Sequence, residues 1–375
     1  MHIETFKAHF QPVEDTRQSA KVTYPLFDVL FGTLCAVIAG AKGWFDIREY
    51  LLGHHDWFIE HGMFEAGVPA DDTIARIISR IKPAMFRECF VQWMQSVHQL
   101  TDGELVAIDG KTLRGSYNRE DRNATIHMVS AYSSANKLVL GQLKTDRKSN
   151  EITAIPELLR MLDLRGALVS IDAIACQTKI AKTIVAQGGD YFLAVKGNQS
   201  KLSKAVQHAF SAQRVADLED NKLETEIHHG RVESRRCYVL NAEALDGDFS
   251  RWAGLNTIAM VESYRTEKGK PVQLGYRYYI SSKTMTAEQV AKAAREHWAI
   301  ESMHWVLDVS MQEDACQIYK DHAAENLACL RHMSLNMLRA EPTKLSIVGK
   351  QRRCWMKTEH LEKVLIAGIQ SAVEN

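Results

Sequence analysis

The first hundred residues are predicted to be helical. Apolar residues recur at helical spacing in four segments, separated by glycines and by Pro83: 26–41, 44–52, 72–81 and 83–98. Asp71-Asp72-Thr73 supplies cap residues before the third segment, and Pro83 is suited to the first turn of the fourth. We expect an N-terminal helical domain over residues 1–100, which is either a small DNA-binding unit or a cap packed on the remainder of the protein.

The pattern changes at residue 104, where Val, Ile, Leu and Tyr gather in short runs bounded by turn residues. These runs predict strands at 104–109, 125–133, 137–144, 167–172 and 190–195. Helical patterns at 156–162 and 178–187 separate the last three, which gives the order β-β-β-α-β-α-β. The first three strands are joined by short polar connections, so we expect them to form an antiparallel meander.

A second strand-rich region follows within residues 201–284. It opens with a helix-like stretch and then predicts strands at 231–240, 255–264 and 274–281, with a turn at Lys268-Gly269-Lys270. Helical patterns resume over 286–308 and 323–340. We therefore divide the chain into the helical domain, a core over 101–200, a β-rich insertion over 201–284, the rest of the core over 285–345, and a basic C-terminal tail over 346–375.

Composition and charge narrow the class of protein. The 375 residues are 46% hydrophobic and 25% charged, with a formal net charge of +0, which is typical of a globular protein and leaves room for local basic clefts. The seven cysteines are scattered without a Cys-x-x-Cys pair, so neither a zinc knuckle nor a disulfide framework is predicted. No secretory signal and no membrane-spanning run is recognisable, and a cytoplasmic, nucleoid-associated protein is expected.

Two aspartates follow the most apolar strand runs. Asp109 comes after Leu105-Val106-Ala107-Ile108, and Asp172 after Leu168-Val169-Ser170-Ile171. Runs of this kind are buried on both faces, so a carboxylate at their ends lies at the edge of a core, where a divalent cation can compensate its charge. The alternative is structural: Asp109-Gly110 is an ordinary turn and Asp172 caps the following helix.

A third acid lies on an unusual helix. At 3.6 residues per turn, one stripe of this helix carries His297, Glu301, His304 and Asp308. The remaining faces hold tryptophans and aliphatic residues, so we expect a buried helix whose polar stripe faces a cleft. A zinc site is the less favoured interpretation, because the His-Glu-x-x-His pattern is absent.

Asp109, Asp172 and Glu301 together would supply hard oxygen ligands for Mg²⁺ or Mn²⁺. Two such ions are suited to in-line displacement at phosphorus without a covalent enzyme intermediate. Residues expected to meet phosphate oxygens of DNA near this site are Lys111, Lys196, Asn198 and Gln199.

Several short motifs occur in an order that resembles a known family. The chain resembles insertion-sequence transposases of the H-repeat-associated (Rhs-linked) group, DDE transposases with an RNase H-like core. The likeness rests on the order and spacing of Ala107-Ile108-Asp109-Gly110-Lys111, Lys148-Ser149-Asn150-Glu151-Ile152-Thr153-Ala154-Ile155-Pro156, Ile171-Asp172-Ala173, Val195-Lys196-Gly197-Asn198-Gln199, His229-Gly230-Arg231, and His297-Trp298-x-Ile300-Glu301-x-x-His304-Trp305-x-Leu307-Asp308-Val309.

The resemblance implies a five-stranded mixed sheet in which the strands that carry Asp109 and Asp172 are neighbours, with Glu301 closing the triad after the β insertion. It also implies hydrolysis at element ends followed by transfer of the 3′-hydroxyls into target DNA, and a homodimer that pairs two ends. Related transposases carry an arginine four residues before the glutamate; this chain has His297 there and Arg295 nearby, and both are candidate DNA contacts. A nuclease without strand transfer, and a retired copy that only binds DNA ends, are the alternatives.

Overall fold

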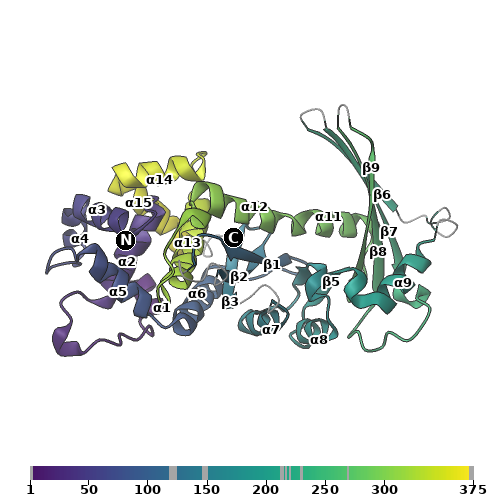
Figure 1. Cartoon of the computed structure of the whole chain (residues 1–375), viewed down its shortest axis with the longest axis horizontal. Helices are drawn as coiled ribbons and strands as arrows, with labels where there is room; N and C mark the ends of the chain where they lie inside the picture. The colour runs from purple at the N-terminus through teal and green to yellow at the C-terminus, as the bar shows by residue number, and fades with distance from the viewer. Residues whose placement is uncertain are drawn as a thin grey trace.

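The computed structural model describes residues 3–117, 125–145, 151–211, 215, 218, 221–228, 231–267 and 270–370. The molecule is elongated, with helices at one end, a sheet in the middle and a projecting β-ribbon at the other end (Figure 1). Three sequence features named above lie outside the described residues, wholly or in part: Lys148-Ser149-Asn150, His229-Gly230 and Lys268-Gly269.

The N-terminal part is helical, as predicted, up to Val97. Its elements are α1 (Ile3–Phe10), η1 (Ser19–Lys21), α2 (Leu26–Ile38), α3 (Trp44–Gly53), α4 (His55–Glu60), α5 (Asp71–Arg80) and α6 (Pro83–Val97). Pro83 does begin α6. The rings of Phe31 and Trp93 each lie 5.8 Å from that of Phe6, in edge contacts typical of aromatic cores. Short α1 and α4 were not predicted.

The C-terminal segment is not a tail. It forms α14 (Ile347–Met356) and α15 (Thr358–Gln370), which pack with α13 (Ala323–Ala340) beside the N-terminal helices (Figure 1). Lys350 of the expected basic cluster is buried, and its Nζ donates to the Leu338 carbonyl at 2.7 Å and lies 3.1 Å from a Glu341 carboxylate oxygen. The prediction of a tail fails because helical amphipathicity outweighs the basic composition.

The predicted β-β-β-α-β-α-β order is confirmed. Strand β1 is antiparallel to β2, and β2 to β3, whereas β4 runs parallel to β1 and β5 runs parallel to β4. The elements of this part are β1 (Leu105–Leu113), β2 (Ile126–Ser133), β3 (Leu138–Thr145), α7 (Glu151–Met161), β4 (Leu168–Ile171), η3 (Ala173–Ala175), α8 (Thr178–Ala186), β5 (Asp190–Val195) and η4 (Gly197–Gln199).

The insertion extends this sheet. Strand β9 pairs antiparallel with β5, so the described residues form one mixed sheet of nine strands in the order β3-β2-β1-β4-β5-β9-β8-β7-β6, in which the strands of the predicted β-rich insertion continue the first five. The elements of the insertion are α9 (Ser200–Ala209), β6 (Asn221–His228), β7 (Arg231–Asn241), η5 (Ala242–Ala244), β8 (Thr257–Glu267) and β9 (Gln273–Ser281). Strand β6 was not predicted.

A broken helical segment spans the sheet from the ribbon towards the helical end (Figure 1). It comprises α11 (Ala287–His297), α12 (Ala299–Trp305), a π-turn η6 (Val306–Ser310) and η7 (Glu313–Ala315). Thr286 and Gln289 form a capping box that begins α11. The expectation of a buried helix is wrong: Ile300, Met303 and Leu307 face the core, but Trp298 and Trp305 are exposed. No helix among the described residues is long and apolar enough to span a membrane.

Candidate active site

Parallel pairing of β1 with β4 brings Asp109 and Asp172 to the same part of the sheet. The register aligns Ile108 with Ile171, and each aspartate is the next residue along its strand. The sequence predicted that strand β1 ends at Asp109. The strand instead continues to Leu113, because it remains paired with β2. Asp172 leaves the sheet and directly precedes η3.

The carboxylate of Asp109 lies in a strongly acidic environment. Burial raises the pKa of Asp109, and the nearby carboxylates of Asp172, Glu151 and Glu301 raise it further, to about 7, although the backbone N–H of Gly110 opposes the shift. Several acids therefore share this edge of the sheet without enough positive charge to compensate them. Such a concentration of carboxylate is what a divalent cation stabilises.

The polar stripe of α11 and α12 faces these strand ends. His297 Nε2 lies 3.8 Å from Asp172 Oδ1, and His304 Nδ1 lies 3.6 Å from Asp109 Oδ2. Glu301 lies between the two histidines in sequence, and burial together with the charge of Asp172 raises its pKa. The stripe predicted from the sequence is therefore directed at both aspartates.

The donor set fits Mg²⁺ or Mn²⁺, because three carboxylates from a sheet edge and a helix supply only hard oxygen ligands. In the conformation seen, no group of three or more His, Cys, Asp or Glu side chains in the described part of the chain is close enough to hold an ion. The side chains of Asp172 and Glu301 are both exposed at this site, in contrast to the partly buried Asp109.

A buried histidine and glutamate beside Asp109 were not recognised from the sequence. His127 Nε2 lies 2.5 Å from Glu151 Oε1, and Thr112 Oγ1 lies 2.9 Å from His127 Nδ1. A Cβ at residue 110 would collide with both side chains, which explains the glycine after Asp109. Glu151 opens α7, where an acid is usually explained by the helix dipole, so its contact with His127 was not predicted, although Glu151 belongs to one of the motifs that carry the family resemblance.

Lys111, expected to contact DNA, is buried in an ion-pair cluster instead of facing the solvent. Its Nζ lies 2.6 Å from Asp308, 2.7 Å from Glu313 and 3.2 Å from Asp314. Arg331 approaches the same Glu313 at 3.9 Å. Lys111 thus connects β1 to the turns that follow α12, and the placement argues for a structural role.

The loop after β5 braces the loop that carries Asp172. Asn198 donates from Nδ2 to the Ala173 carbonyl at 2.7 Å, and Gln199 donates from Nε2 to the Cys176 carbonyl at 2.9 Å. Lys196, just before them, is exposed and has no ion-pair partner within the described ranges. Of the predicted phosphate contacts, Lys196 is therefore the side chain available to an incoming ligand.

The two residues expected near DNA on α11 have partners within the protein. Arg295 pairs with Glu226 of β6 at 2.6 Å and also with Glu224, so it joins the helix to the ribbon. His297 is largely buried, with Nδ1 3.0 Å from Ser170 Oγ, and burial lowers its pKa. Beside it, the guanidinium of Arg277 lies 4.5 Å from the ring centre of exposed Trp298.

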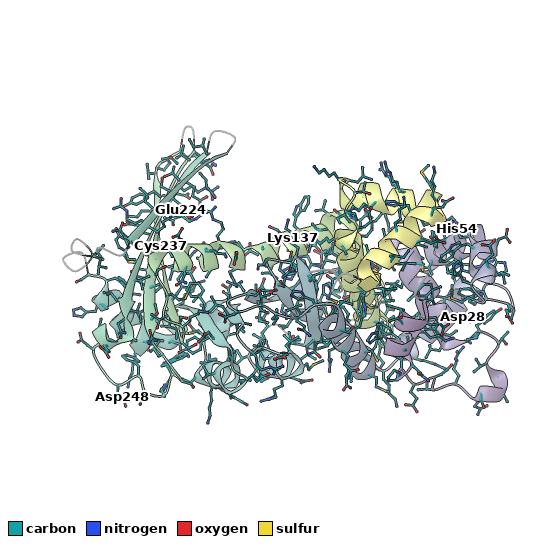
Figure 2. All side chains as sticks on the ribbon, turned by 180° about the vertical axis from the view of Figure 1, so that it is seen from behind. Asp28, His54, Lys137, Glu224, Cys237 and Asp248 are labelled. Atoms are coloured by element: carbon teal, nitrogen blue, oxygen red, sulfur yellow. The ribbon has the colours of Figure 1, made fainter. Side chains whose placement is uncertain are left out.

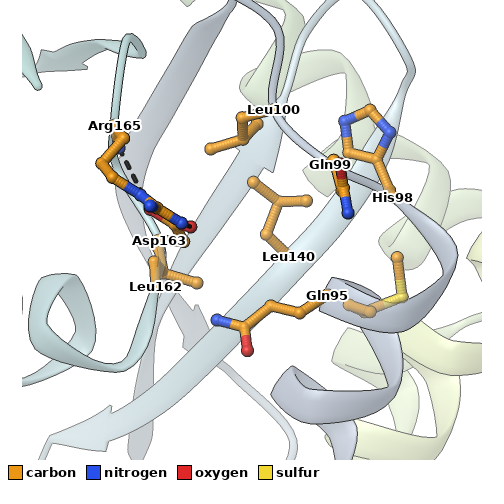
Figure 3. A pocket seen from close by; sticks show the side chains of 9 residues that line it. Gln95, His98, Gln99, Leu100, Leu140, Leu162, Asp163 and Arg165 are labelled. Atoms are coloured by element: carbon orange, nitrogen blue, oxygen red, sulfur yellow. Dashed lines mark hydrogen bonds and ion pairs between the residues drawn. The ribbon is translucent and has the colours of Figure 1, made fainter.

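A pocket of about 440 Å³ lies away from these residues, between α6, β3 and the turn before β4 (Figure 3). It opens near the amino ends of β1 and β4, whereas the aspartates follow the paired residues at the other end. Its charged residues Asp163 and Arg165 form a mutual ion pair, with Arg165 Nε 2.9 Å from Asp163 Oδ1. This pocket offers no group suited to phosphoryl transfer.

Comparison with known proteins identifies the family of the chain. The family described as "Transposase DDE domain" matches residues 100–337, and the family described as "DDE_Tnp_1-associated" matches residues 7–94. A cryo-EM structure of a piggyBac transposase synaptic complex with hairpin DNA has a TM-score of 0.47 at 12% identity, covering 97% of this chain and 81% of that chain. At that level the likeness transfers no structural detail.

Relatives of similar length are known from Escherichia coli. "Putative transposase YncI" of strain O157:H7 is 45% identical over 97% of this chain and 95% of its own length. "H repeat-associated putative transposase YhhI" of strain K12 is 44% identical over 97% of this chain and 98% of its own length. The chain belongs to the transposase DDE family, with an N-terminal DDE_Tnp_1-associated domain.

Proposed function

We propose that this protein is a DNA transposase that hydrolyses phosphodiester bonds at the ends of a mobile element and transfers the freed 3′-hydroxyls into target DNA. The proposal is supported by two observations: Asp109 and Asp172 follow paired residues of the neighbouring strands β1 and β4, and two histidines of the helical segment that carries Glu301 lie 3.6 and 3.8 Å from them. Both steps are displacements at phosphorus, so one site serves both. We include in this proposal that the first five strands and their helices form an RNase H-like core.

Asp109, Asp172 and Glu301 would hold the metal, Mg²⁺ or Mn²⁺, as the pair of ions suited to in-line displacement at phosphorus. Bound ions supply activation of the attacking oxygen and stabilisation of the departing one. His297 and His304 orient the two aspartates from the helix side, at 3.8 and 3.6 Å. Burial lowers the pKa of both histidines, which keeps them neutral beside the carboxylates.

DNA would approach from the exposed side of this edge. Lys196 is exposed and follows β5 directly, so it is suited to a phosphate contact. Asn198 and Gln199 hold the Asp172 loop in place by hydrogen bonds. Arg295 and His297 would contact DNA only after breaking their present contacts with Glu226 and Ser170. The helical domain, the ribbon and the C-terminal helices are candidates for reading the element ends, in a homodimer acting on nucleoid DNA in the cytoplasm.

The decisive experiment is strand cleavage and joining by the purified protein, with Mn²⁺, on DNA that carries the sequences flanking its own gene. We expect cut and joined products with the wild type and neither with Asp172→Asn. Cutting without joining indicates a metal-dependent nuclease. Binding without either product indicates a retired copy. One relative carries a name of this kind: the "Inactive transposase YbfQ" of E. coli is 43% identical over 22% of this chain.

A further inference from the structure

The β-ribbon formed by β6 to β9 carries an exposed apolar face that has no role in the proposed cleavage and joining of DNA. Directly opposed residues of antiparallel strands share a face, so the register assigns one side of the ribbon. This side, called the ribbon face below, holds six large exposed side chains: Leu223, Ile227, Val232, Tyr264, Leu274 and Tyr276. Monomeric proteins rarely expose so continuous an apolar surface without a binding role.

The opposite side of the ribbon already has its partners. It is charged and in contact with α11: Arg295 of that helix pairs with Glu226 at 2.6 Å, while Arg235 lies 2.8 Å from Glu233 on the same strand, β7. On the apolar side, Tyr238 and Met260 near the base are buried and α9 contacts β9, but the tip of the ribbon projects beyond the helices (Figure 1 and Figure 2). The ribbon face is therefore the side left for a partner.

The charge on the ribbon face argues against DNA as that partner. Arg236 and Glu262 lie directly opposite each other on β7 and β8, so the described charged side chains of this face cancel. Glu262 also interacts with the flanking Tyr264 and Tyr276 hydroxyls. A surface that binds phosphates needs an excess of positive charge, which this face lacks. Tyrosines with aliphatic neighbours are typical of the centre of a protein interface.

The face is complementary to itself. A two-fold axis parallel to the strands, between β7 and β8, sets Arg236 of one copy against Glu262 of the second copy and Glu262 against its Arg236. The same axis sets small Thr225 and Ser234 of β6 and β7 against large Leu274 and Tyr264 of the second copy. We propose that the ribbon face is the interface between two copies of this chain.

The size of the face indicates a weak dimer. Four strands about 4.8 Å apart, each with about six residues beyond the buried row of Tyr238 and Met260 and rising about 3.3 Å per residue, cover roughly 400 Å² per copy, so two copies together stay below the roughly 1,000 Å² of stable specific interfaces. We therefore expect association in the micromolar range, reinforced when both copies hold DNA. The reason for two copies rests on the proposed function, since two element ends must be paired; the interface itself is argued from the ribbon alone.

The test is sedimentation velocity of the full chain without DNA or metal, over concentrations from about 1 to about 100 μM, around the expected affinity. The wild type should shift from monomer to dimer, and Ile227→Glu, at a side chain that is 72% exposed, should raise the dissociation constant at least about tenfold. Phe45→Glu is the matched control, because Phe45 is 63% exposed on α3 at the other end of the molecule, and it should dimerise like the wild type.

A charge exchange makes the test specific for the two-fold arrangement. Arg236→Glu alone and Glu262→Arg alone each place like charges across the axis and should be monomeric, whereas an equimolar mixture of the two variants should dimerise. A wild type that stays monomeric throughout, an Ile227→Glu variant that associates normally, or a mixture that fails to associate overturns the proposal. Weakened DNA binding by a monomeric Ile227→Glu protein would assign the face to DNA instead. None of these outcomes affects the cleavage comparison with Asp172→Asn.

Discussion

The imidazole of His304 lies 3.6 Å from the carboxylate of Asp109, measured from Nδ1 to Oδ2, and it joins α12 to the central strand β1. Burial, together with the charge of Lys111 and His332, lowers the pKa of His304 to about 3, so the ring is neutral at physiological pH. Its other nitrogen is buried without a hydrogen-bond partner among the described residues. The neutral ring therefore packs between α12 and Asp109 and sets the distance between the helix and the aspartate.

Gly110→Ala tests the packing under Asp109. We expect lower stability, by about 1–3 kcal/mol, and loss of DNA cleavage, because the added Cβ collides with the His127 and Glu151 side chains and shifts β1 beside the aspartate. Urea unfolding and a cleavage assay measure the two effects. Gly197→Ala is the control, since a Cβ there meets nothing within 4 Å. Equal behaviour of the two variants would show that the buried pair does not constrain the site.

Lys111→Met tests whether this lysine is structural. Removing its charge leaves Asp308, Glu313 and Asp314 without their buried partner, and breaking a buried ion pair in this way costs about 3–5 kcal/mol. Denaturant unfolding should show this loss. Lys196→Met, at an exposed lysine, should keep the wild-type stability and weaken DNA binding. A stable Lys111→Met protein with weakened DNA binding would restore Lys111 as a DNA contact.

Several elements were predictable because their signals are local. The apolar spacing of residues 323–340 gives α13 with the same bounds, and the runs that end at Ile108 and Ile171 predict the two strands, whereas their pairing was implied only by the family resemblance. Strand β6 was missed because only Leu223 and Ile227 of its eight residues are large and apolar, so its alternation is weak. Its apolar side is the one that we assign to a second copy.

The site itself was predictable only in part. The stripe of α11 and α12 follows from helical periodicity, and its histidines His297 and His304 lie near Asp172 and Asp109. The environment of Lys111 depends on acids about two hundred residues away in the chain. The contact between Glu151 and His127 depends on how helix α7 packs beside β1. Side-chain partners brought together by tertiary packing leave no periodic trace in the sequence.

Glu104→Gln tests a buried carboxylate that secures the beginning of β1. Burial alone would raise the pKa of Glu104, but hydrogen bonds from His98, Ser133 and Asn136 outweigh it and lower the pKa from 4.5 to about 2. A group with a lowered folded pKa stabilises the protein above its unfolded pKa, so this contribution of about 3 kcal/mol is complete above pH 4.5 and is lost as the pH falls towards 2.

Unfolding free energies of the wild type and Glu104→Gln, measured by denaturant between pH 7 and pH 2.5, give the contribution as their difference. We expect a wide gap at neutral pH that narrows progressively below pH 4.5. A gap that stays constant with pH would mean that the charge of Glu104 is not what stabilises this end of the strand.

The central claim is that Asp109, Asp172 and Glu301 act together with a metal, and Glu301→Gln addresses it most directly because this residue comes from a different part of the chain. The measurement is Mn²⁺-dependent cleavage of DNA bearing the element ends by Glu301→Gln and by Glu288→Gln, an exposed acid on the preceding helix α11. We predict no cleavage with Glu301→Gln, wild-type cleavage with Glu288→Gln, and unchanged folding and DNA binding in both. Full cleavage by a folded Glu301→Gln protein would contradict the account.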